Sequence, residues 1–175
     1  MSTGKKEQLV LAPLGGADPE IGRWLAAYED TRQRTLHQLE KADPSRVDDQ
    51  TPDQASLGAI LYHLAAIEAS WLYEEVLEGA WPDDFDNLFP YEVRADGVHL
   101  TPVSGESMAQ HLARLDSIHW ALIEAYRTMR LAEFRRPRSL PEYDVTPEYV
   151  LHHLMQHEAE HRSQIVRVIE RLGQS

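Results

Sequence analysis

Two histidines near the C-terminal end of the chain have the spacing of a pair of metal ligands. His157 and His161 are four residues apart, so on an α-helix they lie about 40° apart around the axis and about 6 Å apart along it. One cation can bind both imidazoles at this spacing. The apolar residues around them share a 3–4 alternation that passes through both histidines: Val150, Leu154, Ile165, Val168 and Leu172. A polar pair in such a core-facing stripe is costly unless it is compensated, and a metal ion would compensate it. The alternative is a pair of histidines hydrogen-bonded to neighbouring helices.

The residues between the two histidines indicate a competing chemistry. The run from His157 to His161 reads His-Glu-Ala-Glu-His, which matches the zinc metalloprotease pattern in which the glutamate activates water. Glu158 would lie about 80° from the mid-line of the two histidines, so a helix permits that role. The rest of the chain disfavours it, because no histidine follows His161 and the one later glutamate, Glu170, lies about 13 Å further along the same helix. We therefore expect Glu158 to lie outside the ligand set or on the surface, and not to act as a general base.

Composition limits the class of protein. A chain of 175 residues has the size of one domain, and we expect residues 1–175 to form one. The formal net charge of −12 disfavours nucleic acid as a partner. The absence of cysteine excludes disulfides, thiolate metal sites and a cysteine nucleophile. We find no signal-peptide core and no run long enough to span a membrane, so we expect a cytoplasmic protein without membrane contact. The basic run at residues 135–138 is expected to be a solvated loop; the alternative is an attraction for an anionic group of a substrate.

Four segments have the apolar periodicity of long helices. Two of them begin with a capping residue followed by proline, at Asp18-Pro19 and Thr146-Pro147. The expected helices cover roughly residues 18–43, 51 or 56–79, 104–132 and 146–173, after an irregular arm at residues 1–17. The connection at residues 79–102 is long enough to cross a bundle, and it could also cover a site. The sequence predicts an all-α protein, a four-helix bundle with a long crossover between its second and third helices.

A third ligand has to come from another helix. His63 lies on the apolar face of the second expected helix, and bundles build metal sites in the core from side chains on facing helices. Taken alone, a histidine on such a face is more often a hydrogen-bonded core residue than a ligand. His119 and His153 are alternative third ligands, with a hydrogen-bonded polar role as the other interpretation. The remaining histidines are expected on the surface: His37, His99, His111 and His152.

Two segments carry a resemblance to a known family. Residues 61–72 (LYHLAAIEASWL) and 153–165 (HLMQHEAEHRSQI) are similar to the histidine segments of the DinB-like superfamily of metal-binding bundles. The resemblance implies that His63, His157 and His161 together hold a divalent metal ion. The chain departs from the family pattern at Ser163, where glycine is usual, and at Gln156, where asparagine is common. Neither position supplies a ligand, so the departures bear on local packing beside the site.

The resemblance also implies a class of reaction. Three neutral imidazoles leave a coordination position open, as in catalytic sites, and characterised relatives include transferases and isomerases that use low-molecular-weight thiols. We expect a metal-dependent enzyme acting on a small molecule with such a thiol as cosubstrate. Zinc or nickel is the expected metal, and iron and copper also fit nitrogen ligands. The alternatives are a metal-dependent hydrolase that activates water and a non-catalytic, stress-related metal-binding or dimerising bundle. Trp81 and Trp120 could support a homodimer.

Overall fold

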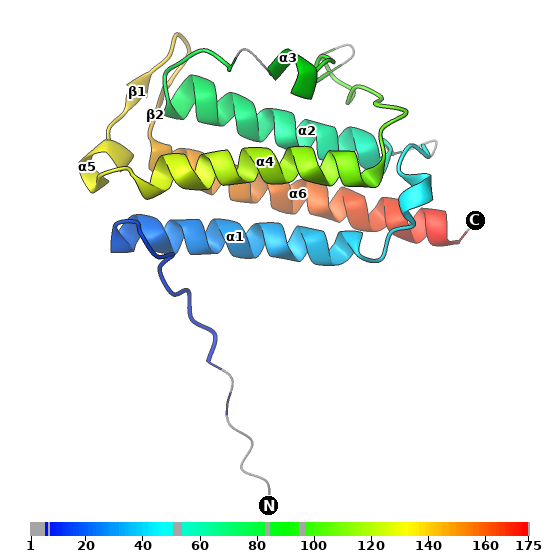
Figure 1. The fold of residues 1–175 in the computed structure, drawn as a ribbon, viewed down its shortest axis with the longest axis horizontal. Helices are drawn as coiled ribbons and strands as arrows, with labels where there is room; N and C mark the ends of the chain where they lie inside the picture. Colours follow the sequence, from blue (N-terminus) through cyan, green and yellow to red (C-terminus); the bar gives the residue numbers. More distant parts are fainter. Residues whose placement is uncertain (1–5, 7, 51–53, 83–84, 95–96, 175) are drawn as a thin grey trace, which may run out of the picture.

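The protein is all-α in a computed structural model that describes residues 6, 8–50, 54–82, 85–94 and 97–174. Helices make up 61% of the described residues, and strands and bridges 4%. Four long helices lie side by side (Figure 1): α1 (Pro19–Leu39), α2 (Leu57–Ser70), α4 (Met108–Arg127) and α6 (Pro147–Gly173). Helix α1 packs on α4 and α6, and α2 packs on the same two helices. The predicted fold class is confirmed, but the described residues contain six α-helices, because α3 (Phe85–Leu88) and α5 (Leu131–Phe134) add one short turn each.

The helix starts follow from local capping. The side chain of Asp18 accepts a hydrogen bond from the backbone of Glu20 at 2.9 Å, and Thr146 accepts one from Tyr149 at 3.1 Å, each with proline next in the chain. Ser56 caps α2, which confirms the later of its two expected starts; the earlier one, at residues 51–52, lies outside the described residues. The helices that carry His63 and the His157/His161 pair, α2 and α6, are thus positioned by caps that the sequence reveals.

Helix α2 does not continue to Gly79 as a regular α-helix. It changes into a π-helical segment, η2 (Trp71–Val76), in which the backbone N–H of Leu77 reaches the carbonyl of Leu72, five residues earlier. The chain then turns at Glu78, whose φ of 51° lies in the left-handed region. Wider π turns are rare and change the direction of the side chains that follow. The expected helix end was therefore wrong by a few residues, and its last turn has a different geometry.

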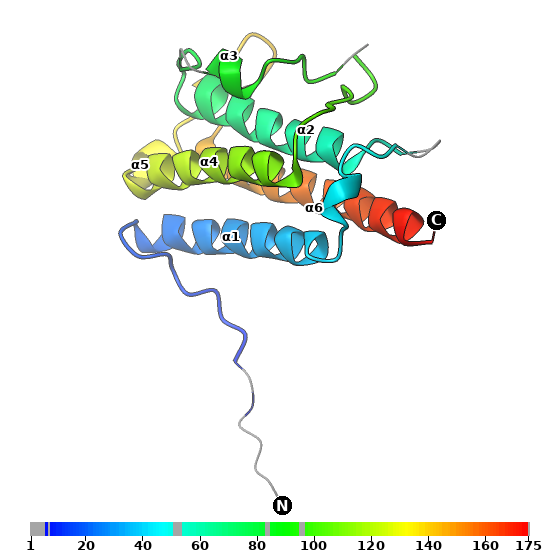
Figure 2. The ribbon, with the colours of Figure 1, turned by 45° about the vertical axis from the view of Figure 1, so that its right-hand side comes forward.

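The long connection after η2 crosses the bundle over α2, as predicted. It carries α3 on the side of α2 that faces away from α1 (Figures 1 and 2). The hydroxyl of Tyr62 on α2 anchors it: this hydroxyl donates to the carbonyl of Tyr91 at 2.6 Å and accepts from the Tyr91 N–H at 2.9 Å. An isolated antiparallel bridge between Arg94 and Leu100 shapes the next turn. The crossover is thus fixed to the helix that carries His63.

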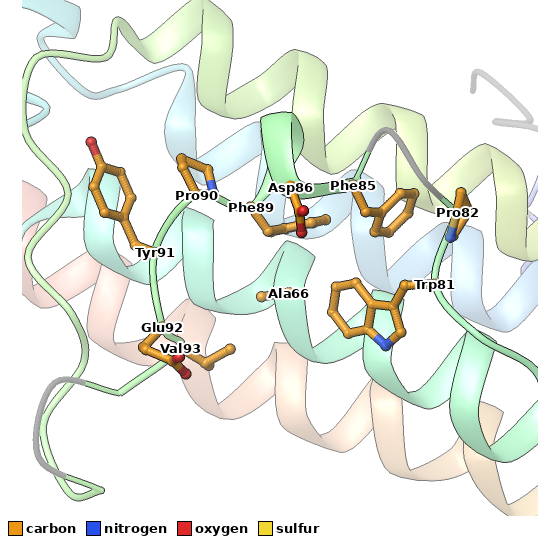
Figure 3. A pocket seen from close by; sticks show the side chains of 10 residues that line it. All are labelled: Ala66, Trp81, Pro82, Phe85, Asp86, Phe89, Pro90, Tyr91, Glu92 and Val93. Carbon is orange, nitrogen blue, oxygen red and sulfur yellow. The ribbon is translucent and has the colours of Figure 1, made fainter.

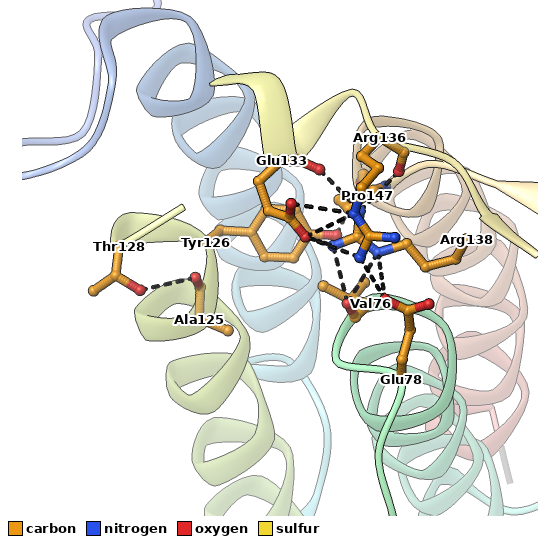
Figure 4. A network of polar contacts seen from close by, with 9 residues as sticks. All are labelled: Val76, Glu78, Ala125, Tyr126, Thr128, Glu133, Arg136, Arg138 and Pro147. Carbon is orange, nitrogen blue, oxygen red and sulfur yellow. Dashed lines mark hydrogen bonds and ion pairs between the residues drawn. The ribbon is translucent and has the colours of Figure 1, made fainter. Parts of the chain in front are cut away.

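The basic run at residues 135–138 is exposed and irregular over residues 135–137, as predicted, but its last residue is buried, which corrects the prediction there. Its last residue, Arg138, begins the two-stranded hairpin of β1 (Arg138–Ser139) and β2 (Asp144–Val145) and is only 2% exposed. The Arg138 guanidinium donates to the carbonyl of Val76 at 3.3 Å and to the Glu133 carboxylate at 2.6 Å (Figure 4). Arg136 also pairs with Glu133 and with Glu78, and Arg135 pairs with Glu20. These contacts join the hairpin to the end of η2, so the cluster has an internal structural role.

The arm before α1 is irregular in its described part, residues 6 and 8–17, and it leads away from the helices (Figure 1). Leu9 is 88% exposed, whereas Leu14 packs against the core. The backbone of Leu14 approaches α1 closely at Gly22, where an added Cβ would lie 2.9 Å from the Leu14 carbonyl oxygen. No helix in the described part of the chain is long and apolar enough to cross a membrane.

Candidate metal centre

Three histidines from two helices meet between α2 and α6. His63 comes from α2, and His157 and His161 come from successive turns of α6. The Nε2 atoms of His63 and His157 are 3.1 Å apart, and one ring nitrogen from each histidine lies within 4.8 Å of the others. The ring of His63 is 5.1 Å from that of His157 and 4.8 Å from that of His161, between centroids. The structure therefore brings together the three histidines that the sequence singled out, here called the histidine triad.

The environment of the triad keeps its imidazoles neutral. Burial, followed by the charges of the neighbouring histidines and Arg94, lowers the pKa of both His63 and His157 to about 3. Burial also lowers the pKa of His161, whose Nδ1 contacts the side-chain oxygen of Gln164 at 2.9 Å. Neutral imidazoles keep a free lone pair for a cation, and a partner on the second nitrogen fixes the orientation of the ring. At neutral pH the triad has the protonation state that a metal ion requires.

The geometry of the donors fits a divalent cation. Tetrahedral zinc with Zn–N bonds of about 2.0–2.1 Å separates its nitrogen ligands by about 3.3 Å, close to the 3.1 Å between His63 and His157. Two neutral Nε2 atoms at this distance can share one hydrogen at most. The buried Nδ1 of His63 has no hydrogen-bond partner among the described residues. A set of three imidazoles suits zinc, nickel, iron or copper.

Comparison with protein families agrees with this geometry. A model of the DinB superfamily matches residues 27–165, a span that contains α2, α4, most of α6 and the entire triad. The chain belongs to the DinB superfamily. A search of the curated proteins found no match. Membership of this superfamily and the buried triad together fit a metal-binding protein.

A second polar cluster of this DinB protein lies in the core beside the triad. Arg32 of α1 donates from Nη2 to Glu68 of α2 at 2.6 Å, and from Nε to both oxygens of Glu158 of α6 at 3.1 Å. Tyr28 donates to the same Glu68 carboxylate. Burial alone would raise the pKa of Glu68, but the Arg32 charge and further hydrogen bonds hold it below the ordinary value. We call the residues Tyr28, Arg32, Glu68, His119 and Glu158 the buried ion-pair network.

This network decides the role of Glu158. The residue is 2% exposed, so the expectation that it could lie on the surface is wrong. Both of its carboxylate oxygens accept from the Nε–H of Arg32, so the carboxylate belongs to a buried ion pair. In the His-Glu-x-x-His pattern of a metalloprotease the glutamate acts on water, whereas here the charge of Glu158 is paired with Arg32.

The two alternative ligands have other contacts. His119 on α4 places its Nε2 2.6 Å from Glu29, stacks on Tyr28 with 4.8 Å between ring centroids, and belongs to the buried ion-pair network. The ring of His153 packs at a tilt of 35° against Trp71 of η2, with 4.3 Å between centroids, and lies one turn before His157. Among the described residues, the group of three that could hold an ion contains neither of them.

One histidine expected on the surface is buried. His111 on α4 is fully enclosed, because a glycine on α2 leaves room for its ring: a Cβ added at Gly58 would lie 2.8 Å from His111 Nε2. Its Nδ1 contacts a guanidinium nitrogen of Arg114 at 3.2 Å. The other three residues expected on the surface, His37, His99 and His152, are exposed as predicted.

Arg94 is the residue near the triad that the sequence analysis missed. It lies in the crossover, where its Nη1 donates to the carbonyl of Val98 at 2.6 Å, and its charge acts on all three triad histidines. The sequence does contain a signal for this residue, because Arg94 is the only lysine or arginine between residues 79 and 102. A positive charge that acts on the triad would favour an anionic ligand there.

Proposed function

We propose that this DinB protein binds one divalent metal ion through His63, His157 and His161. The observation that carries the proposal is the meeting of three neutral imidazoles whose ligand nitrogens lie within 4.8 Å of one another. Zinc or nickel is the expected ion, given an all-nitrogen ligand set in a chain without cysteine.

The proposed activity is metal-dependent transfer or isomerisation with a low-molecular-weight thiol. A bound ion lowers the pKa of a thiol that coordinates it, which produces the reactive sulfur anion near neutral pH. The residues of the chain contribute the rest of the environment. Three protein ligands leave a position open, and Arg94 places a positive charge beside the triad that favours an anionic sulfur over a neutral one.

The test is a screen of metal-loaded protein against a panel of thiols and electrophilic acceptors. Turnover that requires both the metal and a thiol supports the proposal. Turnover with water alone would instead favour the hydrolase, which is the weaker alternative because Glu158 is held by Arg32. A metal-loaded protein without turnover would favour the non-catalytic bundle. A homodimer remains a prediction, for which Trp120, half exposed on α4, is the available contact residue.

Arg94 provides a more specific test of the thiol mechanism. Replacing Arg94 with Gln should raise the apparent pKa of thiol-dependent turnover and the KM for an anionic thiol while leaving metal content unchanged. Arg34→Gln is the matched control, because Arg34 is an exposed arginine of α1 paired with Asp30 within the same helix. Equal pH profiles for Arg94→Gln and the wild type would remove Arg94 from the mechanism.

A further inference from the structure

A cavity of about 620 Å³ lies between the crossover and α2 (Figure 3). Its size is within the range of small-molecule sites, which is roughly 300–1,000 Å³. Ala66 of α2 forms its floor, and the other lining residues come from the crossover: Trp81, Pro82, Phe85, Asp86, Phe89, Pro90, Tyr91, Glu92 and Val93. It is therefore a built pocket with aromatic walls, formed by the segment that also carries Arg94.

Two segments that line the cavity are close in sequence to residues at or near the histidine triad. Ala66 lies three residues after His63, which is about 4.5 Å further along α2. On the crossover, Val93 lines the cavity and is followed directly by Arg94, whose charge reaches the three imidazoles. The cavity and the triad are therefore built in part from the same stretch of α2 and the same part of the crossover.

The aromatic walls are held in place by their own contacts. The ring of Trp81 packs edge-on against Phe85 and Phe89, with centroids 5.3 and 5.7 Å apart, and its Nε1 donates to Glu74 at 2.6 Å. Phe89 also packs edge-on against Tyr62 of α2 at 5.7 Å. Rings fixed in this way present a preformed apolar surface, so a ligand need not order it.

The charges that line the cavity have one sign. Asp86 and Glu92 are exposed side chains, the cavity has no basic lining residue, and within the described ranges neither carboxylate has a hydrogen-bond or ion-pair partner. Aromatic ring faces attract organic cations, and a nearby carboxylate strengthens that attraction. The two carboxylates would repel an anionic ligand and would gain nothing from a purely apolar one.

We propose that this cavity binds a small aromatic molecule that carries a protonated amine. The aromatic part lies among Trp81, Phe85 and Phe89, and the ammonium group lies near Asp86 and Glu92. The binding of this molecule to the cavity does not depend on the proposed function. The further assignment of this molecule as the substrate class of the metal centre rests on the proposed function.

The first experiment compares three probes of one shape. Isothermal titration of wild-type protein, with and without zinc, uses 2-phenylethylamine, the neutral 2-phenylethanol and the anionic phenylacetate. We expect the amine to bind at least about tenfold more tightly than the alcohol, in line with a desolvated cation–π and carboxylate contact, and phenylacetate to bind most weakly. An amine that binds no better than the alcohol, or that does not bind at millimolar concentration, overturns the proposal.

Matched variants separate this cavity from the general attraction of an acidic protein for cations. Asp86→Asn combined with Glu92→Gln keeps the shape and should reduce amine affinity to that of the alcohol. Asp116→Asn combined with Glu170→Gln removes two exposed charges elsewhere and should change amine affinity less than twofold. Equal losses in the two double variants overturn the proposal. Ala66→Leu fills the floor and should weaken both amine and alcohol; unchanged amine affinity in folded Ala66→Leu protein also overturns it.

The outcome is independent of the proposed catalysis. Selective amine binding without any thiol-dependent turnover supports the cavity and contradicts the proposed function. Thiol-dependent turnover without amine binding overturns the cavity assignment and leaves the proposed function standing.

Discussion

The histidine triad and the buried ion-pair network occupy the same layer of the core but treat buried polar groups in opposite ways. Both join α2 to α6. In the triad His63 contacts His157, and in the network Arg32 pairs with both Glu68 and Glu158. The network contains its own cation, Arg32, and its carboxylates are paired. In the triad the Nε2 atoms of two neutral imidazoles, His63 and His157, face each other. The buried Nδ1 of His63 has no hydrogen-bond partner in the described part of the chain.

The difference indicates which cluster needs an ion from outside. Burying polar groups is costly unless each finds a partner. In the network Arg32 and the two carboxylates meet this cost within the fold, so that the helices are linked before any ligand arrives; the Nδ1 of His119 lies 3.6 Å from Glu68 without a hydrogen bond. In the triad the cost is met only when a cation binds. The network therefore links the helices that carry the triad whether or not an ion is bound, whereas the stability of the triad depends on the bound ion.

The largest effect should follow from removing the internal cation. Arg32→Met leaves Glu68 and Glu158 buried without their partner, which should lower the free energy of unfolding by about 3–5 kcal/mol. Urea denaturation measures the change. The control is Arg34→Met, which removes an exposed pair with Asp30 and should leave the free energy of unfolding nearly unchanged. If the two variants are equally stable, Arg32 does not hold the core as described.

A smaller effect is expected when one carboxylate of the network is neutralised. Glu158→Gln keeps the shape and leaves Arg32 its contact with Glu68, so the loss in unfolding free energy should be about 1–3 kcal/mol. Metal content should be unchanged, and any thiol-dependent activity should stay within about tenfold of the wild type. Metal-loaded Glu158→Gln protein without any activity would instead place this glutamate in the mechanism.

One histidine from each cluster, His63 of the triad and His119 of the network, should respond to pH with opposite signs. The pKa of His63 is about 3 in the fold against about 6.5 when unfolded, so the unfolded chain binds more protons and the metal-free protein loses stability as the pH falls from 6.5 towards 3. Burial opposes protonation of His119, but Glu68 and Glu29 outweigh it and raise its pKa. Its contribution is therefore complete below pH 6.5 and is lost as the pH rises through the folded pKa.

Variants of the two histidines separate these contributions. As the pH falls from 6.5 to 4, metal-free His63→Leu should lose less stability than the wild type. As the pH rises above 6.5, His119→Leu should lose less stability than the wild type, because it lacks the contribution that His119 gives up there. Denaturation curves on both sides of pH 6.5 measure the two slopes. Slopes that change in the same direction for the two variants would contradict the comparison.

The sequence predicted the parts of this structure that local patterns determine. The caps at Asp18 and Thr146 and the spacing of His157 and His161 are local signals, and they gave the helix starts and two members of the triad. The resemblance of residues 61–72 and 153–165 to one family supplied the third member, His63, since no spacing relates residues on different helices.

The parts that were missed depend on tertiary contacts. Arg32 stands among Asp30, Gln33 and Arg34, so its sequence context is that of a solvated helix face, yet it is buried. His111 is buried only because Gly58 on another helix leaves space for its ring. Arg138 likewise finds its partners at Val76 and Glu133, and the fold alone brings these together.

The most direct test of the account is a metal titration of His63→Ala against the wild type. Zinc affinity, measured by competition with a chromophoric chelator, should show one site in the wild type. It should be weaker by more than about a hundredfold in His63→Ala, since loss of an outer partner of a ligand alone can cost up to about that much. Zinc should also raise the melting temperature of the wild type and not that of the variant, whereas the exposed-histidine control His152→Ala should match the wild type in both measurements. Wild-type affinity and thermal shift in folded His63→Ala protein would contradict the assignment of the triad as a single metal site.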